Sequence, residues 1–155
     1  MALLRARESA MTYFRPMLNQ FGLTEQQWRV IRVLQEFGKL EFRELSQICC
    51  IQPPSLTGIL TRLERDALVR RQRSAIDQRR LHVSLTRKGV ARFKALSDHI
   101  EVGYRALERR LGSGRFKALM SIVQELAELE PPEATRQSLR RSSRSKSLTS
   151  RQDPN

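Results

Sequence analysis

The sequence predicts a mainly α-helical fold with one small β-hairpin, on the strength of three observations. Apolar residues recur at helical spacing over most of residues 2–129. Residues 68–85 instead alternate as two short strands around a polar tip. From residue 131 onward, serines and basic residues replace the apolar ones, which is typical of a disordered basic tail. We therefore expect one folded domain over residues 1–130 and a tail over residues 131–155.

The chain has 155 residues and is strongly basic, with a net charge of +13. The tail holds six basic residues against Glu133 and Asp153 and so carries +4, which leaves +9 on residues 1–130. Such a charge favours a polyanionic partner, either a nucleic acid or an anionic membrane surface. The tail is either a solvated appendage or a source of loose, salt-sensitive contacts to phosphates.

No run of about 18 apolar residues occurs, so the sequence predicts no transmembrane span. The N-terminus lacks the apolar segment and cleavage site of a signal peptide. We therefore expect a cytoplasmic protein. A disulfide between the adjacent Cys49 and Cys50 would be strained. We interpret them as small apolar residues in a reducing compartment, and a thiol redox sensor is the alternative.

The N-terminal half predicts three helices. The first covers residues 2–19, with Pro16 as a weak point in its last turn. The second begins at Thr24, which caps it together with Gln27, and ends at Gly38. After a short link, which has the length of a single β-bridge, a third and shorter helix directs four residues inward. These are Phe42, Leu45, Ile48 and Cys49.

A fourth helix begins near Pro53, because proline is well tolerated in a first helical turn. One of its faces is an apolar stripe formed by Leu56, Ile59, Leu60 and Leu63. The opposite face carries short hydroxylic residues, a glycine and arginines, namely Ser55, Thr57, Gly58, Thr61, Arg62 and Arg65. Such a face is narrow enough to enter a major groove and to donate to bases and phosphates. The alternative is an ordinary surface helix.

The hairpin follows, with one strand over residues 68–73 and a tip over residues 74–78. Leu81, Val83 and Leu85 are the inward residues of the return strand. Arginines at a hairpin tip suit the minor groove, where the negative potential is deep. We expect the carboxylate of Asp77 to clamp the guanidinium of Arg79 and so to fix its direction. The alternative is a surface ion pair of little energetic worth.

Helix, helix, strand, basic tip and strand is the order of a winged helix-turn-helix, which predicts a DNA-binding protein. The expected DNA-binding residues are Pro53, Ser55, Thr57, Gly58, Thr61, Arg62, Arg73, Asp77 and Arg79.

Thr86 then caps a long helix from Arg87 to about Leu111, and the glycines of residues 112–114 separate it from a last helix that ends near Leu129. These helices and the first one have apolar faces that no large sheet covers. A two-fold dimer would cover them and would set two recognition helices roughly 34–36 Å apart. We therefore expect a DNA-binding lobe over residues 24–90, with residues 1–20 and 90–129 at a dimer interface. In the alternative, these helices close the core of a monomer.

Two segments resemble the MarR family. The pattern Asp77-x-Arg79, followed by Leu85-Thr86 and Lys88-Gly89, looks like the family's wing signature. The segment Leu63–Arg70 is similar to the preceding family pattern, with Ala67 in place of the usual glycine. Within the family the chain is most similar to repressors of homoprotocatechuate (4-hydroxyphenylacetate) degradation operons. The resemblance covers about residues 2–129.

This resemblance implies a dimeric winged-helix repressor that binds a pseudo-palindromic operator and is released by a small aromatic acid. In this family the ligand commonly lies between the N-terminal helices, the dimer helices and the DNA-binding lobe. Aromatic walls and an arginine for a carboxylate suit such a ligand. By resemblance and chemistry, the candidates are Tyr13, Phe14, Arg15 and Trp28, with Met17 beside them. Phe14 and Trp28 are also natural core residues.

Enzyme activity has little support in the sequence. The two histidines, His82 and His99, are far apart, and no phosphate-binding glycine loop, nucleophile motif or metal-ligand cluster occurs. We expect no enzyme, no cofactor and no bound metal. One alternative function is an architectural DNA-binding protein without a ligand. A third and weaker hypothesis is a protein of the membrane surface.

Overall fold

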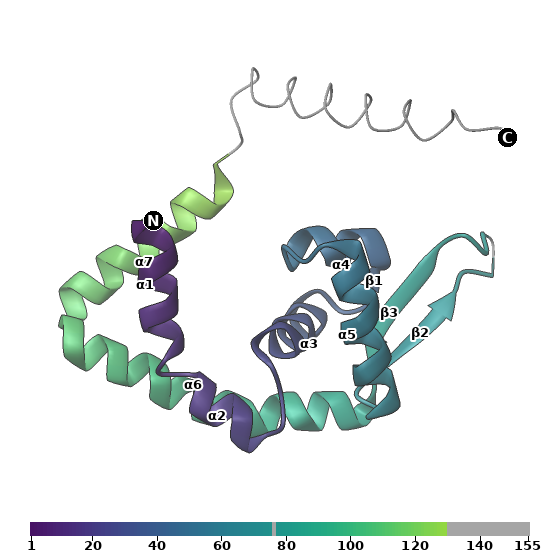
Figure 1. Ribbon diagram of the computed structural model, residues 1–155, viewed down its shortest axis with the longest axis horizontal. Coiled ribbons are helices and arrows are strands. Elements are labelled where there is room, and N and C mark those ends of the chain that lie inside the picture. Colours follow the sequence, from purple (N-terminus) through teal and green to yellow (C-terminus); the bar gives the residue numbers. More distant parts are fainter. Residues whose placement is uncertain (76, 130–155) are drawn as a thin grey trace, which may run out of the picture. The chain divides into compact units, whose positions relative to one another are not determined.

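The computed structural model describes residues 1–75 and 77–129 (Figure 1). The tail expected over residues 131–155 lies outside the described residues. The chain divides into two units, one from Met1 to Leu111 and one that begins at Gly112. The first unit contains six helices and three strands within its described residues. They are α1 (Ala2–Met11), α2 (Arg15–Gln20), α3 (Glu25–Phe37), β1 (Leu40–Glu41), α4 (Phe42–Ile48), α5 (Pro53–Arg65), β2 (Val69–Arg73), β3 (Leu81–Leu85) and α6 (Arg87–Leu111). The second unit contains α7 (Ser113–Glu128).

This element order confirms the predicted fold class, a mainly helical winged helix. One boundary was wrong: residues 2–19 form two helices, α1 and α2, separated by Thr12–Phe14. Pro16 lies in the first turn of α2 and not in the last turn of a longer helix. The reason is that proline lacks an N–H and its ring clashes with the preceding turn, so it starts a helix more readily than it continues one.

The caps of α3 agree with the prediction. The backbone N–H of Gln27 donates to the Thr24 hydroxyl at 3.2 Å, and the Gln27 side chain accepts from the N–H of Thr24 at 2.9 Å. Gly38 ends the helix with a φ of 75°. Ile48, which was expected to face inward, is instead 42% exposed, and Phe37 at the end of α3 is 54% exposed.

The three strands form one antiparallel sheet in the order β1-β3-β2. The short link expected after α3 is therefore a two-residue strand, in which Leu40 pairs with Val83. The hairpin register pairs Val69 with Leu85 and Arg73 with Leu81. In Figure 1 the hairpin of β2 and β3 projects away from the helices beside α5.

The core of the first unit lies between α2, α3, α4, α5, α6 and the sheet. Its largest fully buried side chains include Leu18, Ile31, Leu45, Leu56, Leu60, Leu63, Val83 and Leu96. All four members of the predicted apolar stripe of α5 are buried. Helix α6 contacts α2, α3 and β3, and so runs along the base of this core.

The base of the hairpin is joined to α6 by a close junction. The Thr86 hydroxyl accepts from the N–H of Gly89 at 3.0 Å, as expected for a helix cap, and donates to the carbonyl of Ala67 at 2.6 Å. The N–H of Thr86 donates to the carbonyl of Leu68 at 3.0 Å. A Cβ atom at Gly89 would lie 2.1 Å from that same carbonyl oxygen. Only glycine therefore fits where α6 crosses the hairpin.

Helices α1 and α7 contain no buried residue. In α1, Leu3 is 71% exposed. In α7 the exposed apolar residues follow a helical stripe, made of Leu119, Ile122, Val123 and Leu126. None of the helices over residues 1–75 and 77–129 has both the length and the apolar character needed to cross a membrane.

Candidate nucleic-acid interface and cavity

The face of α5 opposite the core is fully solvent-exposed. It carries Ser55, Thr57, Gly58, Thr61, Arg62 and Arg65, and Pro53 begins the helix. A Cβ atom at Gly58 would meet nothing within 4 Å, so the surface is flat there. Arginines in the last turn place positive charge at the C-terminal end of the helix.

The two threonine hydroxyls of this face have backbone partners. Thr57 donates to the carbonyl of Pro53 and Thr61 donates to the carbonyl of Thr57, both at 3.0 Å. Each hydroxyl proton is therefore engaged inside the helix, whereas the sequence suggested donation outward. Both threonines are solvent-exposed, and a hydroxyl that donates inside the helix can still accept from a base amino group.

The turn between α4 and α5 sets the direction of α5. The Ser46 hydroxyl donates to the carbonyl of Ile51 at 2.7 Å, and the N–H of Ile51 donates back to the carbonyl of Ser46 at 3.1 Å. Cys50 has a φ of 50°, a left-handed conformation that side chains disfavour. A third bond comes from α3, where the Arg29 guanidinium donates to the carbonyl of Cys49 at 3.1 Å.

The tip of the hairpin corrects one prediction. The Asp77 carboxylate accepts from the backbone N–H of Arg79 at 3.0 Å and does not clamp its guanidinium. The bond closes a turn over two residues, a common role of aspartate in tight turns. Arg79 is therefore positioned through its backbone, and its side chain is exposed.

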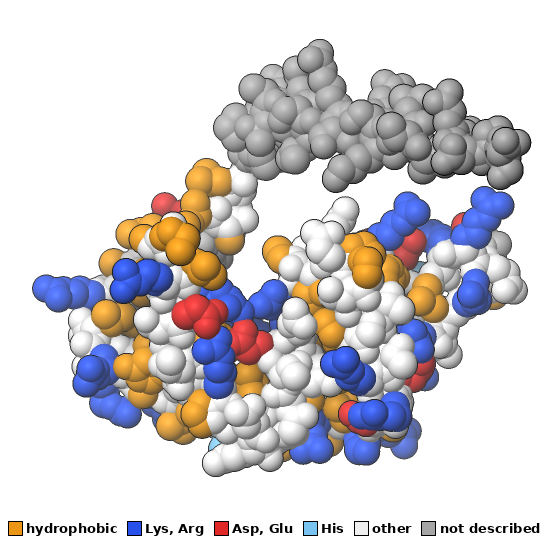
Figure 2. All heavy atoms as spheres, in the orientation of Figure 1, with side chains coloured by type: hydrophobic (Ala, Val, Ile, Leu, Met, Phe, Trp, Pro, Cys, Tyr) orange, Lys and Arg blue, Asp and Glu red, His pale blue; other side chains and the backbone are white. Residues whose placement is uncertain are grey.

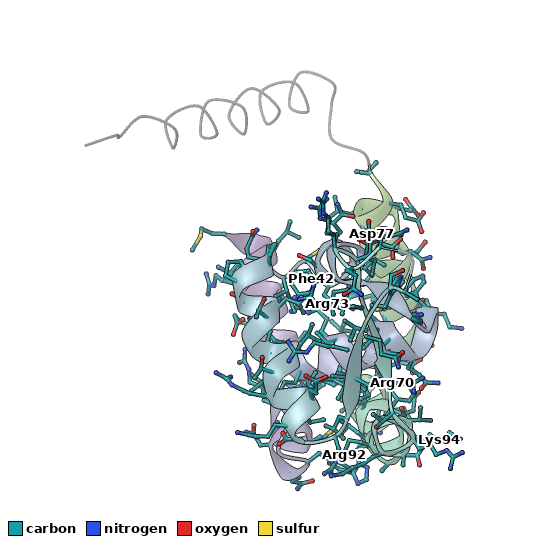
Figure 3. The ribbon with its side chains drawn as sticks, turned by 90° about the vertical axis from the view of Figure 1, so that its right-hand side faces the viewer. Phe42, Arg70, Arg73, Asp77, Arg92 and Lys94 are labelled. Atoms are coloured by element: carbon teal, nitrogen blue, oxygen red, sulfur yellow. The ribbon has the colours of Figure 1, made fainter. Side chains whose placement is uncertain are left out.

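Two other arginines hold the hairpin. The Arg73 guanidinium donates to the carbonyl of Gln78 across the tip at 2.9 Å. The Arg80 guanidinium donates twice to the Glu41 carboxylate of β1, at 2.9 and 2.8 Å, and this pairing raises the pKa of Arg80. Lys and Arg side chains gather at the outer end of the hairpin in Figure 2. In Figure 3 the labelled Arg70, Arg73 and Asp77 follow one another toward the tip.

A cavity of about 180 Å³ lies between α1, α2, α3 and α6. Its lining residues are Arg7, Met11, Phe14, Leu18, Glu25, Trp28, Arg29, Arg32, Ile100 and Tyr104. Two of the predicted ligand residues, Phe14 and Trp28, thus belong to the lining, and Tyr13 and Arg15 do not. The ring of Trp28 also stacks on that of Phe93 in α6, with the two centroids 5.3 Å apart.

Arg15 is unsuited to bind the carboxylate of a ligand, because its guanidinium is already paired with two glutamate carboxylates. Its guanidinium donates to Glu8 at 2.5 Å and to Glu25 at 2.9 Å. The hydrogen bond from Arg15 lowers the pKa of Glu8, and the same bond raises the pKa of Arg15. Arg7 of the cavity wall is paired with the same two carboxylates.

The sequence did not single out Arg29 and Arg32, yet both line the cavity. Their recorded partners are neutral oxygens, the Cys49 carbonyl for Arg29 and the Tyr104 hydroxyl, at 3.4 Å, for Arg32. With Glu25 and Trp28 they are spaced at i, i+3, i+4 and i+7 on α3, so one helix face turns toward the cavity. This spacing is visible in the sequence and could have identified both arginines as cavity residues.

Other titratable groups add little chemistry. Burial raises the pKa of the Cys49 thiol to about 11, which keeps it protonated and disfavours a redox sensor at that residue. Cys50 is exposed. His82 is half-buried in β3, and its Nδ1 atom has no hydrogen-bond partner within the described residues. Over the same residues, no three His, Cys, Asp or Glu side chains are grouped as metal ligands would be.

Comparisons with known proteins agree with this geometry. Residues 23–81 match the family model described as the MarR family. The chain is 45% identical over 128 residues to the homoprotocatechuate degradative operon repressor of Escherichia coli, covering 83% of this chain and 86% of that protein. The crystal structure of transcriptional regulator PA4135 is 48% identical with a TM-score of 0.81, over 84% of this chain and 96% of that one. The structure of NadR in complex with 4-hydroxyphenylacetate is 45% identical with a TM-score of 0.72, over 83% and 92%.

Proposed function

The chain belongs to the MarR family of transcriptional regulators, and from this premise we propose that it represses an operon of aromatic catabolism. It binds a pseudo-palindromic operator as a dimer and leaves it when a small aromatic acid, of the type of 4-hydroxyphenylacetate, is bound. The similar proteins are regulators and not enzymes, so no catalytic step is involved. The observation that carries the proposal is the cavity, which pairs aromatic walls with the arginines Arg29 and Arg32.

The operator contacts come from two elements. Helix α5 enters the major groove with its exposed face, where Ser55, Thr57 and Thr61 meet base edges and Arg62 meets a phosphate. Pro53 and Gly58 keep that face narrow enough to approach the bases. The hairpin reaches the minor groove with Arg79, which Asp77 holds through its backbone and whose turn Arg73 closes.

The aromatic acid occupies the cavity. Its ring packs between Phe14 and Trp28, and its carboxylate is paired with Arg29 and Arg32. Glu25 at the wall repels a second negative charge and accepts from a ligand hydroxyl. Tyr13 and Arg15 stand behind the wall and shape it: Arg15 engages Glu8 and Glu25, and the carbonyl of Tyr13 packs near Gly103.

The test is operator binding measured by fluorescence anisotropy, with a duplex from the region upstream of the chain's own operon. Footprinting should protect one short palindrome, and 4-hydroxyphenylacetate should release the protein. The variant Arg79→Ala should lose about 1–3 kcal/mol of operator affinity with little change in preference at major-groove positions. Thr57→Ala should alter sequence preference instead.

The competing hypothesis is a DNA-binding protein that works by charge alone and has no ligand. It predicts equal affinity for any duplex of the same length and no response to aromatic acids. Such a result would exclude the regulated repressor. An unchanged affinity of Arg79→Ala would exclude the minor-groove role of the hairpin.

A further inference from the structure

The turn between α4 and α5, residues 49–52, contains a residue in a strained backbone conformation. Cys50 is in the left-handed region, with a φ of 50°, although it is not a glycine. The paired bonds between Ser46 and Ile51 close the turn from inside. Helix α5 begins directly after this turn at Pro53, so the geometry of the turn contributes to the direction of α5.

One side chain connects this turn with the cavity. Arg29 lines the cavity, and its guanidinium also donates to the carbonyl of Cys49 at 3.1 Å. Cys49 is completely buried, so its carbonyl sits in surroundings that water does not reach easily. The residues are 20 apart in sequence. A single guanidinium is thus shared between a ligand space and the support of the recognition helix.

We propose that Arg29 is a positioning residue that couples the cavity to the direction of helix α5. This inference rests on the proposed function, because it needs an aromatic carboxylate as the ligand. Without the acid, Arg29 donates to the Cys49 carbonyl and supports the turn. A carboxylate offers a charge-assisted and bidentate partner, which is stronger than a neutral carbonyl. The guanidinium turns toward it, the bond to Cys49 is lost, and the strained turn relaxes.

This arrangement supplies what allosteric release requires, namely a ligand that interacts differently with two states of the protein. In the DNA-binding state Arg29 is divided between carbonyl and acid, and in the released state it serves the acid alone. The acid therefore stabilises the released state. By reciprocity, operator DNA lowers the affinity for the acid by the same factor.

Arg32 provides the matched control. It lies one helical turn further along α3 and lines the same cavity, but its guanidinium meets the Tyr104 hydroxyl of α6 and not the turn. Arg32 should therefore contribute to affinity for the acid without carrying the coupling. Comparing variants of the two arginines therefore distinguishes binding of the acid from transmission of its effect to α5.

The experiment uses the full chain, an operator duplex and 4-hydroxyphenylacetate at concentrations up to saturation. In the wild type, saturating acid should raise the operator Kd on the order of 5- to 150-fold. Arg32→Met should need more acid but reach the same maximal change. Arg29→Met should bind the operator roughly fivefold more weakly without acid, the effect of one lost hydrogen bond. In this variant, saturating acid should change the operator Kd by less than about twofold. Arg29→Lys, which restores a charged donor, should recover part of the change.

The chain's two cysteines, Cys49 and Cys50, give a second readout that does not involve DNA. Cys50 is exposed, whereas Cys49 is buried, so we expect an alkylating reagent to reach Cys50 first. Iodoacetamide labelling followed by mass spectrometry should show that the acid accelerates the alkylation of Cys49 in the wild type and in Arg32→Met. Arg29→Met should show no acceleration.

The outcomes separate the two proposals. A full acid response in Arg29→Met at saturation, or acid that protects Cys49 in the wild type, would overturn the coupling role of Arg29. If the acid neither binds nor affects the wild type, the proposed function fails instead. Should Arg29→Met not fold, Arg29→Lys and the labelling of the wild type decide the question.

Discussion

The predicted DNA-binding lobe, residues 24–90, and the helices α1 and α7 differ in how far their apolar residues are buried. In the lobe, α3 and α5 bury every residue of their apolar stripes except Phe37 and the half-buried Trp28. In α1 and α7 no residue is buried, and Ile122 of α7 is 61% exposed. The apolar stripes of α3 and α5 are thus covered within one chain, by a core that also includes Leu18 of α2 and Leu96 of α6.

This difference indicates which properties of the protein should depend on contact with another chain. An apolar stripe that solvent covers in a single chain favours contact with another surface, and a two-fold partner offers the same stripe in return. We expect residues 24–90 to fold locally, and we predict that the spacing of two copies on an operator depends on α1 and α7. Variants in the two regions should therefore fail in different ways.

The largest effect is expected in α7, from Leu126→Glu. A buried leucine contributes about 1.5–3 kcal/mol, and two-fold symmetry counts each substitution twice, so the dimer should lose roughly 3–6 kcal/mol. Sedimentation equilibrium should show monomers at concentrations where the wild type is dimeric, with the lobe still folded by circular dichroism. Gln124→Glu, the same charge outside the apolar stripe, is the control. A dimer that survives Leu126→Glu unchanged would remove α7 from the interface.

The next effect lies in the lobe, at the junction of the hairpin with α6. Gly89→Ala forces a Cβ atom to within 2.1 Å of the Leu68 carbonyl oxygen, so backbone must move and about 3 kcal/mol of unfolding free energy should be lost. Gly58→Ala, where nothing lies within 4 Å, should instead gain about 0.5–1 kcal/mol as a helical glycine replaced by alanine. Urea unfolding measures both. Equal responses would mean that the junction is not rigid.

Local sequence signals predicted the lobe well because its elements are fixed by neighbours along the chain. The Thr24 and Thr86 caps rest on hydrogen bonds three residues apart, and the stripe of α5 is a spacing that can be read within one helix. The prediction was wrong where local signals did not decide the structure. Proline disfavours the interior of a helix, but the sequence around Pro16 did not show whether it weakens a last turn or begins a new helix.

A third effect uses a departure from the family pattern. Ala67 occupies a left-handed conformation, with a φ of 56°, which costs an L-residue about 1–2 kcal/mol. Ala67→Gly removes that strain but adds freedom to the unfolded chain, so we expect a net gain of about 1 kcal/mol in the lobe. Ala91→Gly, in the interior of α6, should lose about 1 kcal/mol. If both substitutions destabilise equally, the turn at Ala67 is unstrained.

The candidate site was harder to predict than the fold, because its contacts join distant parts of the chain. The pairing of Arg80 with Glu41 spans 39 residues, and the bond from Arg29 to Cys49 spans 20. Neither has a local signal. Arg15 was chosen by resemblance and chemistry, and only the structure reveals that its guanidinium is already paired with Glu8 and Glu25. The sequence shows where the arginines are, but not which of them are already bonded to other groups of the chain.

The smallest effect concerns the ion pair that joins α5 to β2 inside the lobe. Glu64 accepts from the Arg71 guanidinium at 2.7 Å and from its backbone N–H at 3.1 Å, and the guanidinium bond lowers the pKa of Glu64. A lowered folded-state pKa stabilises the protein above the ordinary carboxyl value and loses this contribution as the pH falls through the folded value. The pair is partly exposed, so Glu64→Gln should cost less than about 1 kcal/mol at pH 7.

Urea unfolding of the wild type and Glu64→Gln at pH 7 and again near pH 3 isolates the charge, because every other carboxylate titrates equally in both proteins. The difference between the two should shrink toward zero in acid. A difference that persists near pH 3 would assign the role of Glu64 to packing and not to its charge. The same comparison on Glu8, whose pKa Arg15 lowers at the α1–α2 bend, tests the region outside the lobe. There a monomeric variant such as Leu126→Glu should give the same pH dependence as the dimer if the ion pairs of α1 stabilise only the single chain.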